Sequence, residues 1–486
     1  MRIFLLLLML GVNAANAATF SLGSGLQDGM VIQQNHPLIV WGSGGAGDTV
    51  SIRADWMTDA VMVKVDPSGN FSGIIPVPAV RAGDYRPHSL VVMDGASRIT
   101  LNDVLIGEVW LCSGQSNMQF PVKEATDSTA EVAAAKYPYL RLLDVRLNFS
   151  ATPIERFDGH WMECTPATVA KFSAVGYYFG RELLQKLQVP VGVVFSGIGA
   201  SAAQAYVPQP VLAADSQLDR IYLQPYLSSP RSKENIDGGF SFEKVTRPCL
   251  LYNAMIYPLR RMSIRGICWY QGEANRMERD SYTRLTQTLI KSWRDLFGQG
   301  ELPFYYVQVA PFFWDKEDDT LADYSFFREA QEKVSELNNT AMVTTVDVGE
   351  AKNLHPHNKK PIGIRLARTA LNRIYGRGDV VWRGPQYQHM EVAGGKAVIF
   401  FQPGTTVGGL QGALRFFTIA GADRKFYPAQ AKVEGDRIMV WSPKVRHPAA
   451  VRYAFTNYAV TDLHNGEGWP VIPFRTDDWR EQSLVK

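Results

Sequence analysis

A serine in a tight turn directly after an apolar run is the first residue of this sequence that could do chemistry. Ser116 lies in the segment WLCSGQSNMQF, residues 110–120, where Gly114 permits a sharp turn. A serine hydroxyl held in this way becomes a nucleophile when a histidine accepts its proton and N–H groups stabilise the resulting oxyanion. Judged by position alone, Ser116 is instead a helix cap, because serine is a favoured N-cap residue. Ser113, three positions earlier, is expected to support the turn.

A histidine that could accept the serine proton lies far along the chain, in the polar segment NLHPHNKK. His355 precedes Pro356, which restricts the histidine to an extended backbone and could fix how its ring is presented. His357 lies in the same segment, and an exposed position is the ordinary expectation for either ring. No carboxylate or further histidine stands at metal-ligand spacing, so the segment does not predict a zinc site.

Three further residues could stabilise developing charge or hold the site together. Gly199, in SGIGAS, would let a backbone N–H approach an oxyanion closely, although a flexible strand exit is its simpler explanation. Gln271 and Glu273, in YQGEAN, offer a side-chain amide donor and a carboxylate. For an isolated Gln or Glu in a loop, exposure to solvent is the ordinary expectation.

The elements that must position these residues alternate between strands and helices over residues 103–378. In chain order, the segments GQSNM, SGIGAS and YQGEAN come after the apolar runs VLIGEVWLC, VPVGVVF and IRGICW. The fourth segment, NLHPHNKK, lies between AMVTTVDV and a helix expected near Pro361. This alternation predicts a mostly parallel sheet with helices on both faces. Ligands of such sheets bind beyond the carboxyl ends of the strands, so we expect the four loops to converge on one site.

Other parts of the chain predict flanking domains and export. Short β-type runs separated by turns predict an all-β domain over residues 18–102 and a C-terminal β region over residues 379–486. Residues 1–17, with an early Arg2, an apolar stretch and small residues near the end, predict a secretory signal peptide. We therefore expect a protein of the periplasm or the medium. No segment has the roughly 18 to 20 apolar residues of a membrane span.

The amino-acid composition limits the kinds of molecule that the protein is expected to bind. Lys and Arg number 50 against 47 Asp and Glu, a net charge of +3, and no basic block predicts nucleic-acid binding. Four cysteines show no CxxC spacing, so one or two disulfides and buried free thiols are both open. The oligomeric state is not indicated.

The order of the polar segments resembles that of the sialate O-acetylesterase and acetylxylan-esterase-like group of SGNH hydrolases. The resemblance covers nearly the whole chain after residue 17 and is carried by DGMVIQQNHPLIVWG, GEVWLCSGQSNMQFPV, LLYNAMIYPL, IRGICWYQGEAN, HPHNKKPIGIRLA and HNGEGWPVIPFRTDDW. GQSNM, WYQGE and HP..K...G.RLA together are far more specific than a lone serine motif. The resemblance implies a flavodoxin-like, three-layer α/β catalytic domain with accessory all-β domains, and hydrolysis of acetyl esters on sugars.

Carried over residue by residue, the resemblance implies that Ser116 is the nucleophile and His355 the general base. It also implies an oxyanion hole formed by the backbone N–H groups of Ser116 and Gly199 and by the side chain of Gln271. Such a reaction requires neither a metal nor an organic cofactor.

One position departs from the pattern of the family. Many SGNH hydrolases have an aspartate three residues before the catalytic histidine, but this sequence has Lys352 there. What orients the His355 ring is therefore open. The alternatives are a carboxylate elsewhere, a backbone carbonyl or a Ser-His dyad, and the residues considered are Asp347, Glu350, Glu273 and Asn353. Glu273 is assigned to holding its loop rather than to proton transfer.

The sugar is also left open. The family name favours O-acetylated sialic acid, whereas secreted relatives of similar layout act on acetylated hemicellulose such as xylan or xyloglucan. An anionic sialic acid would benefit from an arginine, and Arg247, Arg276 and Arg279 lie in suitable loops, although a surface charge or local ion pair is the ordinary expectation. The segment ASAAQAY, where close relatives tend to carry Gly-Thr and a later Trp, indicates an altered sugar pocket.

Two other functions compete with the acetylesterase. A carbohydrate-binding protein whose esterase site has decayed would bind sugar without turnover, as Lys352 and the two β regions suggest. A lipase-like SGNH hydrolase would act on long acyl chains, but no long apolar loop supports it.

Overall fold

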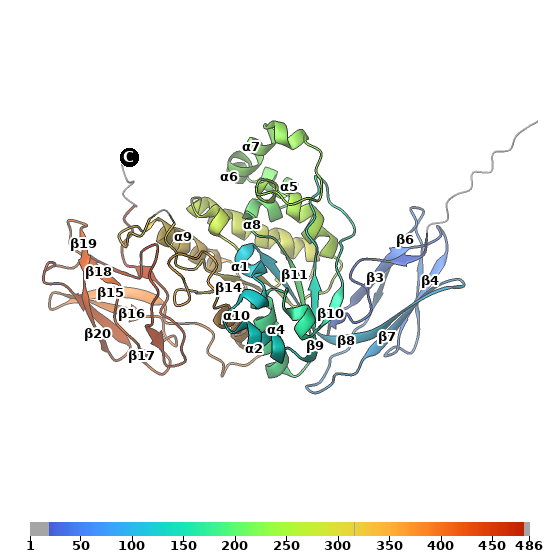
Figure 1. Cartoon of the computed structure of the whole chain (residues 1–486), viewed down its shortest axis with the longest axis horizontal. Helices are drawn as coiled ribbons and strands as arrows, with labels where there is room; N and C mark the ends of the chain where they lie inside the picture. The colour runs from blue at the N-terminus through green and yellow to red at the C-terminus, as the bar shows by residue number, and fades with distance from the viewer. Residues whose placement is uncertain (1–18, 315, 481–486) are drawn as a thin grey trace, which may run out of the picture.

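The computed structural model describes residues 19–314 and 316–480, and the predicted signal peptide at residues 1–17 lies outside them. An N-terminal β unit, strands β1 to β7, is followed by a central α/β domain and by a C-terminal β unit, strands β15 to β24. The central domain lies between the two β units (Figure 1). The predicted architecture, a three-layer α/β domain with accessory β regions, is confirmed.

The central sheet has the strand order β10-β9-β11-β8-β12-β13-β14. Neighbours from β9 to β14 are parallel, and β10 pairs with β9 antiparallel. Parallel strands covered on both faces are continuous apolar runs, and β11, VGVVFSG, is buried along its whole length. The strands are β8 (Ser97–Gly114), β9 (Tyr137–Asp144), β10 (Trp161–Cys164), β11 (Val191–Gly197), β12 (Gly266–Tyr270), β13 (Phe304–Val307) and β14 (Thr340–Val343).

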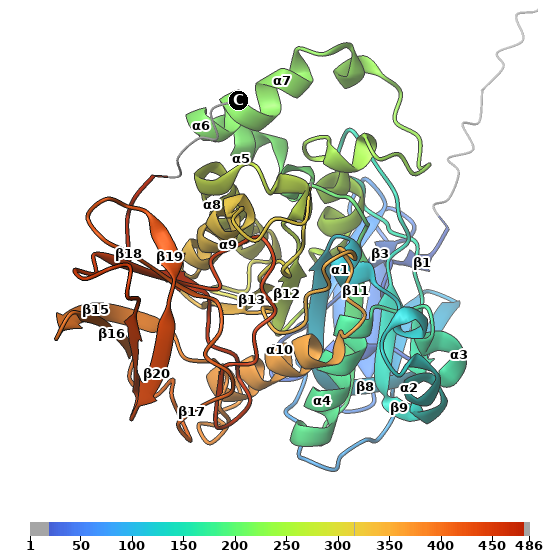
Figure 2. The same ribbon diagram turned by 60° about the vertical axis from the view of Figure 1, so that its left-hand side comes forward.

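Helices cover both faces of this sheet. The helices are α1 (Ser116–Gln119), α2 (Ser128–Ala134), α3 (Pro166–Val169), α4 (Ala174–Leu187), α5 (Gln209–Ala214), α6 (Ser216–Leu218), α7 (Gln224–Leu227), α8 (Arg279–Phe297), α9 (Asp323–Glu332) and α10 (Lys360–Arg373). Helices α4 and α10 lie side by side on one face (Figure 2). Alternate residues of β8 separate two cores: Trp110 and Cys112 pack with α4 and α10, and Val109 and Leu111 pack with α8 and α9.

Strand β8 joins the N-terminal β unit to the central sheet. Its first half pairs with β7 and its second half with β11 and β12. Asp103, at the changeover, has a φ of 53°, and Arg141 Nη1 donates to its carboxylate at 2.5 Å. The expected boundary between residues 102 and 103 thus lies inside one strand of 18 residues. The other strands of this unit are β1 (Ser21–Leu22), β2 (Val31–Gln33), β3 (Leu38–Ser43), β4 (Thr49–Ala54), β5 (Val61–Lys64), β6 (Asn70–Ile75) and β7 (His88–Asp94).

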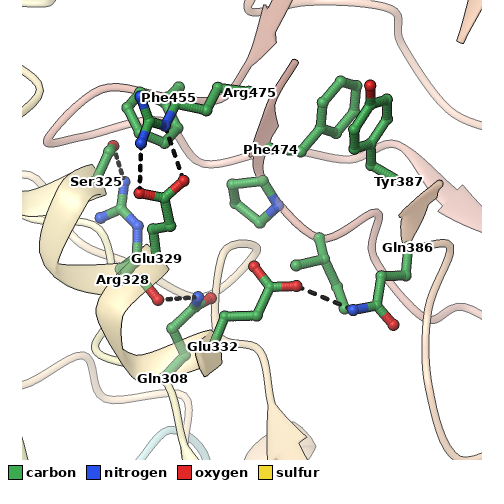
Figure 3. A pocket seen from close by; sticks show the side chains of 12 residues that line it. Gln308, Ser325, Arg328, Glu329, Glu332, Gln386, Tyr387, Phe455, Phe474 and Arg475 are labelled. Atoms are coloured by element: carbon green, nitrogen blue, oxygen red, sulfur yellow. Dashed lines mark hydrogen bonds and ion pairs between the residues drawn. The ribbon is translucent and has the colours of Figure 1, made fainter. Parts of the chain in front are cut away.

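The C-terminal β unit is antiparallel and is anchored to α9. Arg475 Nε and Nη2 donate to the two carboxylate oxygens of Glu329 at 2.8 and 2.9 Å, beside a cavity of about 100 Å³ (Figure 3). Arg328, which is buried, donates to the backbone oxygen of Thr456. The strands are β15 (Tyr387–Ala393), β16 (Lys396–Phe401), β17 (Leu410–Gln411), β18 (Phe417–Ala420), β19 (Phe426–Pro428), β20 (Gln430–Glu434), β21 (Arg437–Trp441), β22 (Ala450–Tyr453), β23 (His464–Asn465) and β24 (Phe474–Arg475).

All four cysteines are buried free thiols, which decides between the two alternatives that the sequence left open. Cys112 and Cys268 lie opposite one another on the neighbouring strands β8 and β12. Within residues 19–314 and 316–480, no helix has the length and apolar character needed to cross a bilayer.

Candidate active site

Ser116 lies in the turn at the carboxyl end of β8. Gly114 has a φ of 140°, and a Cβ there would lie 2.1 Å from the backbone oxygen of Tyr270, so the turn requires glycine. Ser116 is the first residue of α1, and Gln115 precedes it in the cap position. The alternative that Ser116 caps a helix is therefore wrong, and its hydroxyl is free for another partner.

Ser113 has a different environment from Ser116. It is fully buried, and its Oγ donates to the backbone oxygen of Ser196 at 2.5 Å. The bond ties β8 to β11 just before the turn, as expected for a residue that supports it.

His355 lies beside Ser116, although 239 residues separate them in the sequence. His355 Nε2 is 2.8 Å from Ser116 Oγ, and the His355 backbone N–H donates to Asn353 Oδ1 at 3.0 Å. Burial lowers the pKa of His355 below its ordinary value of 6.5, and the positive charge of Lys359 lowers it further. A neutral imidazole at this distance can accept the proton of a serine hydroxyl.

Two of the carboxylates considered as partners of His355 are engaged elsewhere. Asp347 pairs with Arg365 through both oxygens, at 2.7 and 2.5 Å. Glu350 accepts from the backbone N–H of His357 at 2.7 Å, and its Oε1 lies 2.9 Å from His357 Nδ1. Both residues hold the segment around His355 without contacting its ring.

The remaining carboxylate, Glu273, is buried behind the serine turn, where it accepts a hydrogen bond from Asn117 Nδ2 at 2.5 Å. Lys352, at the position of the usual aspartate, is exposed and pairs with Glu317 at 2.8 Å. Among the residues that the structure describes, no carboxylate is hydrogen-bonded to the His355 ring. This arrangement favours a backbone carbonyl or a Ser-His dyad among the alternatives, and the catalytic roles of Ser116 and His355 stay a prediction.

Gly199 lies directly beside Ser116, at the end of β11. A Cβ on Gly199 would be 3.5 Å from Ser116 Cβ. The Gly199 N–H donates to Gln119 Oε1 at 2.8 Å, so a side-chain oxygen already occupies this donor. A substrate oxyanion would have to replace the Gln119 oxygen.

Gln271 is fully buried, and its side-chain amide is hydrogen-bonded to other residues than Ser116. Its Nε2 donates to the backbone oxygen of Ser201 at 3.1 Å and to Asn275 Oδ1 at 2.7 Å. An amide nitrogen carries two hydrogens, and both are used here. The structure therefore does not bring a free Gln271 donor to the site, and the oxyanion hole stays a prediction.

Three residues of the site were not singled out from the sequence. Asn117 and Gln119 lie within the GQSNMQ segment, and Lys359 lies within HPHNKK. The quoted motifs contained all three. Their side-chain contacts, however, are with residues 80 to 242 positions away in the sequence, which no local pattern reveals.

A cleft of about 380 Å³ opens beside Ser116 and His355, and Lys123, Glu124 and Lys171 lie on its wall. The arginines considered from the sequence do not line this cleft. Arg247 is buried in ion pairs with Glu234 and Glu243, and the other two lie against aromatic rings. The cationic side chains that line this cleft, among the described residues and apart from His355, are thus the two lysines.

Comparisons with known proteins point to one activity. A family model described as carbohydrate esterase, sialic acid-specific acetylesterase, matches residues 234–372. Sialate O-acetylesterase of Mus musculus is 27% identical over 435 residues, which cover 80% of this chain and 79% of the mouse protein. The Homo sapiens protein of the same name is 27% identical over 430 residues, covering 81% and 78%.

One solved structure is similar over nearly the whole chain. It is the crystal structure of a carbohydrate acetylesterase from Xanthomonas citri, with 34% sequence identity and a TM-score of 0.83. The match covers 95% of this chain and 100% of that one.

Proposed function

Because this chain belongs to the sialate O-acetylesterase family of carbohydrate esterases, we propose that it removes acetyl groups from sugars through a serine acyl-enzyme intermediate. The carboxylic-ester hydrolase activity follows from the family. The observation that carries the serine mechanism is the 2.8 Å contact between Ser116 Oγ and His355 Nε2 beside the cleft.

The proposed reaction has two steps. In the first, His355 Nε2 accepts the Ser116 proton while Oγ attacks the acetyl carbonyl carbon, and the bond to the sugar oxygen breaks as His355 returns the proton to that oxygen. In the second, water attacks the acetyl-enzyme with His355 as base, which releases acetate and restores the serine. The backbone N–H groups of Ser116 and Gly199 are the proposed oxyanion donors.

We propose O-acetylated sialic acid as the first substrate to test. The cleft wall carries Lys123 and Lys171 against one carboxylate, Glu124, which pairs with Lys123 at 3.8 Å, so its net positive charge would favour a sugar that carries a carboxylate. Acetylated xylan and xyloglucan are the neutral alternatives. We also propose that the protein is exported, on the strength of the signal-peptide pattern in residues 1–17.

The experiment measures acetate release by the purified protein from O-acetylated sialic acid, acetylated xylan, acetylated xyloglucan and an aryl acetate. Ser116→Ala is expected to lower kcat by roughly 10⁴-fold or more, because the nucleophile is lost. Ser97→Ala, at an exposed serine of β8, is the matched control and should retain full activity.

The other outcomes identify the competing functions. Saturable sugar binding without acetate release from any ester would support the decayed carbohydrate-binding protein. Activity that rises from acetyl to octanoyl esters would support the lipase-like hydrolase.

A further inference from the structure

A buried amide side chain connects the residue after Ser116 with the residue before His355. Asn117 is fully buried, and its Nδ2 donates to the backbone oxygen of Leu354 at 3.1 Å. The same Nδ2 donates to Glu273 Oε1 at 2.5 Å. One side chain therefore contacts both the loop that carries the histidine and the loop that follows β12.

Lys359 makes the third contact of Asn117. Its Nζ donates to Asn117 Oδ1 at 2.5 Å and lies 4.7 Å from the centre of the Phe120 ring and 5.7 Å from that of Tyr270. The relative exposure of Lys359 is 0%, and lysine is almost never fully buried without a partner. This lysine is the N-cap residue of α10, four residues after His355.

The chemistry of the partners determines how the Asn117 amide is oriented. An ammonium group can only donate hydrogen bonds, and a backbone carbonyl can only accept them. Oδ1 must therefore face Lys359, and Nδ2 must face Leu354. A reversed amide would place its oxygen against the Leu354 oxygen and its N–H groups against the ammonium.

Burying these charges is costly. Burial lowers the pKa of Lys359 to about 7 and raises the pKa of Glu273. Apolar side chains of similar volume often give equal or greater stability at such a place. Apolar side chains, however, could not orient the Asn117 amide. Orienting this amide is therefore a role for the buried charges that is separate from stability.

We propose that Lys359, Asn117 and Glu273 form a positioning clamp that holds the His355 loop against the serine turn, in place of the orienting aspartate that this chain lacks. The proposal rests on the proposed function, because it concerns the same Ser116–His355 pair. The clamp acts through the backbone, since Asn117 is bonded to Ser116 and Leu354 to His355. None of the three residues lines the cleft.

The first test compares kcat and KM on an aryl acetate for the wild type, Lys359→Met and Asn117→Asp. Methionine keeps the length of lysine but cannot donate, and aspartate keeps the shape of asparagine but cannot donate to Leu354. We expect kcat to fall about 10- to 100-fold in both variants with KM within about twofold, because a displaced base slows the reaction more than binding. Lys360→Met, at the neighbouring lysine that pairs with Glu131, is the matched control and should match the wild type.

The pH profile separates positioning from a loss of folding. The charged and titratable groups around His355 are Lys359, Glu273, Glu350 with its partner His357, and Lys123, Glu124 and Lys171 of the cleft. Of these, Lys359 lowers the pKa of His355. Lys359→Met should therefore move the acid limb of kcat/KM to higher pH, whereas Lys359→Arg, which keeps a cation, should leave it nearly in place.

A structural measurement makes the test independent of turnover. Crystal structures of Lys359→Met and Asn117→Asp are expected to show Ser116 Oγ and His355 Nε2 beyond hydrogen-bond distance, with the Asn117–Leu354 bond lost. The Lys360→Met structure should keep both bonds. Absence of acetate release by the wild type would contradict the proposed function. The crystal structures would still show whether the three residues hold Ser116 and His355 within hydrogen-bond distance.

A double variant tests whether the buried charges serve stability alone. Lys359→Met combined with Glu273→Gln removes both charges, so the melting temperature should recover relative to Lys359→Met. We expect kcat to stay about tenfold or more below the wild type, because the amides at 117 and 273 can then turn together. Recovery of kcat along with stability would overturn the clamp, as would wild-type kcat, acid limb and Ser116–His355 distance in both single variants.

Discussion

The surroundings of His355 keep its imidazole neutral. Burial lowers its pKa, and so does the nearby positive charge of Lys359. A carboxylate in contact with the ring would have the opposite effect, since it stabilises the imidazolium. If His355 is the base, as proposed, its lowered pKa extends the unprotonated form to lower pH, at the cost of weaker stabilisation of the imidazolium formed during the reaction.

This environment predicts the pH dependence of the wild type. Protonation of His355 would remove the proposed base, so we expect kcat/KM to fall as the pH drops through the pKa of that residue. Because this pKa lies below the ordinary 6.5, half-maximal kcat/KM on an aryl acetate should occur below pH 6.5. A midpoint above pH 6.5 would indicate a carboxylate partner for the ring in solution.

That Ser116 and His355 are candidates for one site could be predicted from the sequence, because the turn glycine and the polar loops are local features, and the structure brings the two side chains together. The hydrogen bonds of Gln271 could not, since the partners that take both of its amide hydrogens come into reach only on folding. Lys359 and Lys360 cannot be told apart in the sequence. In the folded chain Lys359 is fully buried, whereas the side chain of Lys360 is 49% exposed. Long-range packing decided each of these cases.

Helix α10 fixes the end of the His355 loop through its close approach to α4. A Cβ on Gly363 would lie 2.6 Å from Tyr178 Cβ and 2.8 Å from the backbone oxygen of Val175. The two helices can therefore lie this close only if residue 363 has no side chain. Their separation in turn sets the position of the clamp lysine at the start of α10.

Gly363→Ala is expected to destabilise the protein by about 1 to 3 kcal/mol, because the added methyl group forces the helices apart. Alanine favours helix by about 1 kcal/mol over glycine, so the steric cost has to exceed that gain. Thermal unfolding measures the effect. Gly378→Ala is the control, since a Cβ there would meet nothing within 4 Å, and an equal melting temperature for both variants would contradict the packing argument.

The strands of the central sheet could be predicted because buried parallel strands are unbroken apolar runs. The continuity of β8 could not, because Asn102 and Asp103 resemble a turn between two domains. In the folded chain Asp103 takes a positive φ inside the strand, and its carboxylate accepts a hydrogen bond from Arg141. The hydrogen bond from Arg141 of β9 thus stabilises Asp103 in a conformation that would otherwise end β8.

The C-terminal β unit is built into the catalytic domain through Asn457. The backbone N–H of Asn457 donates to the Leu321 oxygen at 2.7 Å, and its backbone oxygen accepts from the Phe312 N–H at 3.1 Å. Its Oδ1 accepts from the Tyr324 N–H, at the start of α9, at 2.9 Å. One buried residue therefore holds both ends of the segment 312–321.

That segment leads back to the active site. The Phe313 N–H donates to the Ala351 oxygen at 3.4 Å, and Glu317 pairs with Lys352. Ala351 and Lys352 belong to the loop that carries His355. The C-terminal β unit thus supports the His355 loop indirectly, through residues 313 and 317.

Asn457→Ala should lower the free energy of unfolding by about 1 to 3 kcal/mol, because the buried Tyr324 N–H loses its acceptor. Residues 312–321 should also become more sensitive to limited proteolysis, since their anchor is weakened. The exposed Asn338→Ala is the control. Unchanged melting and unchanged cleavage would show that the C-terminal β unit does not hold this segment.

The contact between Ser116 and His355 spans 239 residues, and that span has a consequence in time. A ribosome adds about 5 to 20 residues per second, so the histidine is made roughly 10 to 50 s after the serine. Strands β11 to β14 must also be made in that interval before the sheet can bring the pair together. A growing chain therefore carries the proposed nucleophile without its proposed base for 239 of its 486 residues, about half of its synthesis.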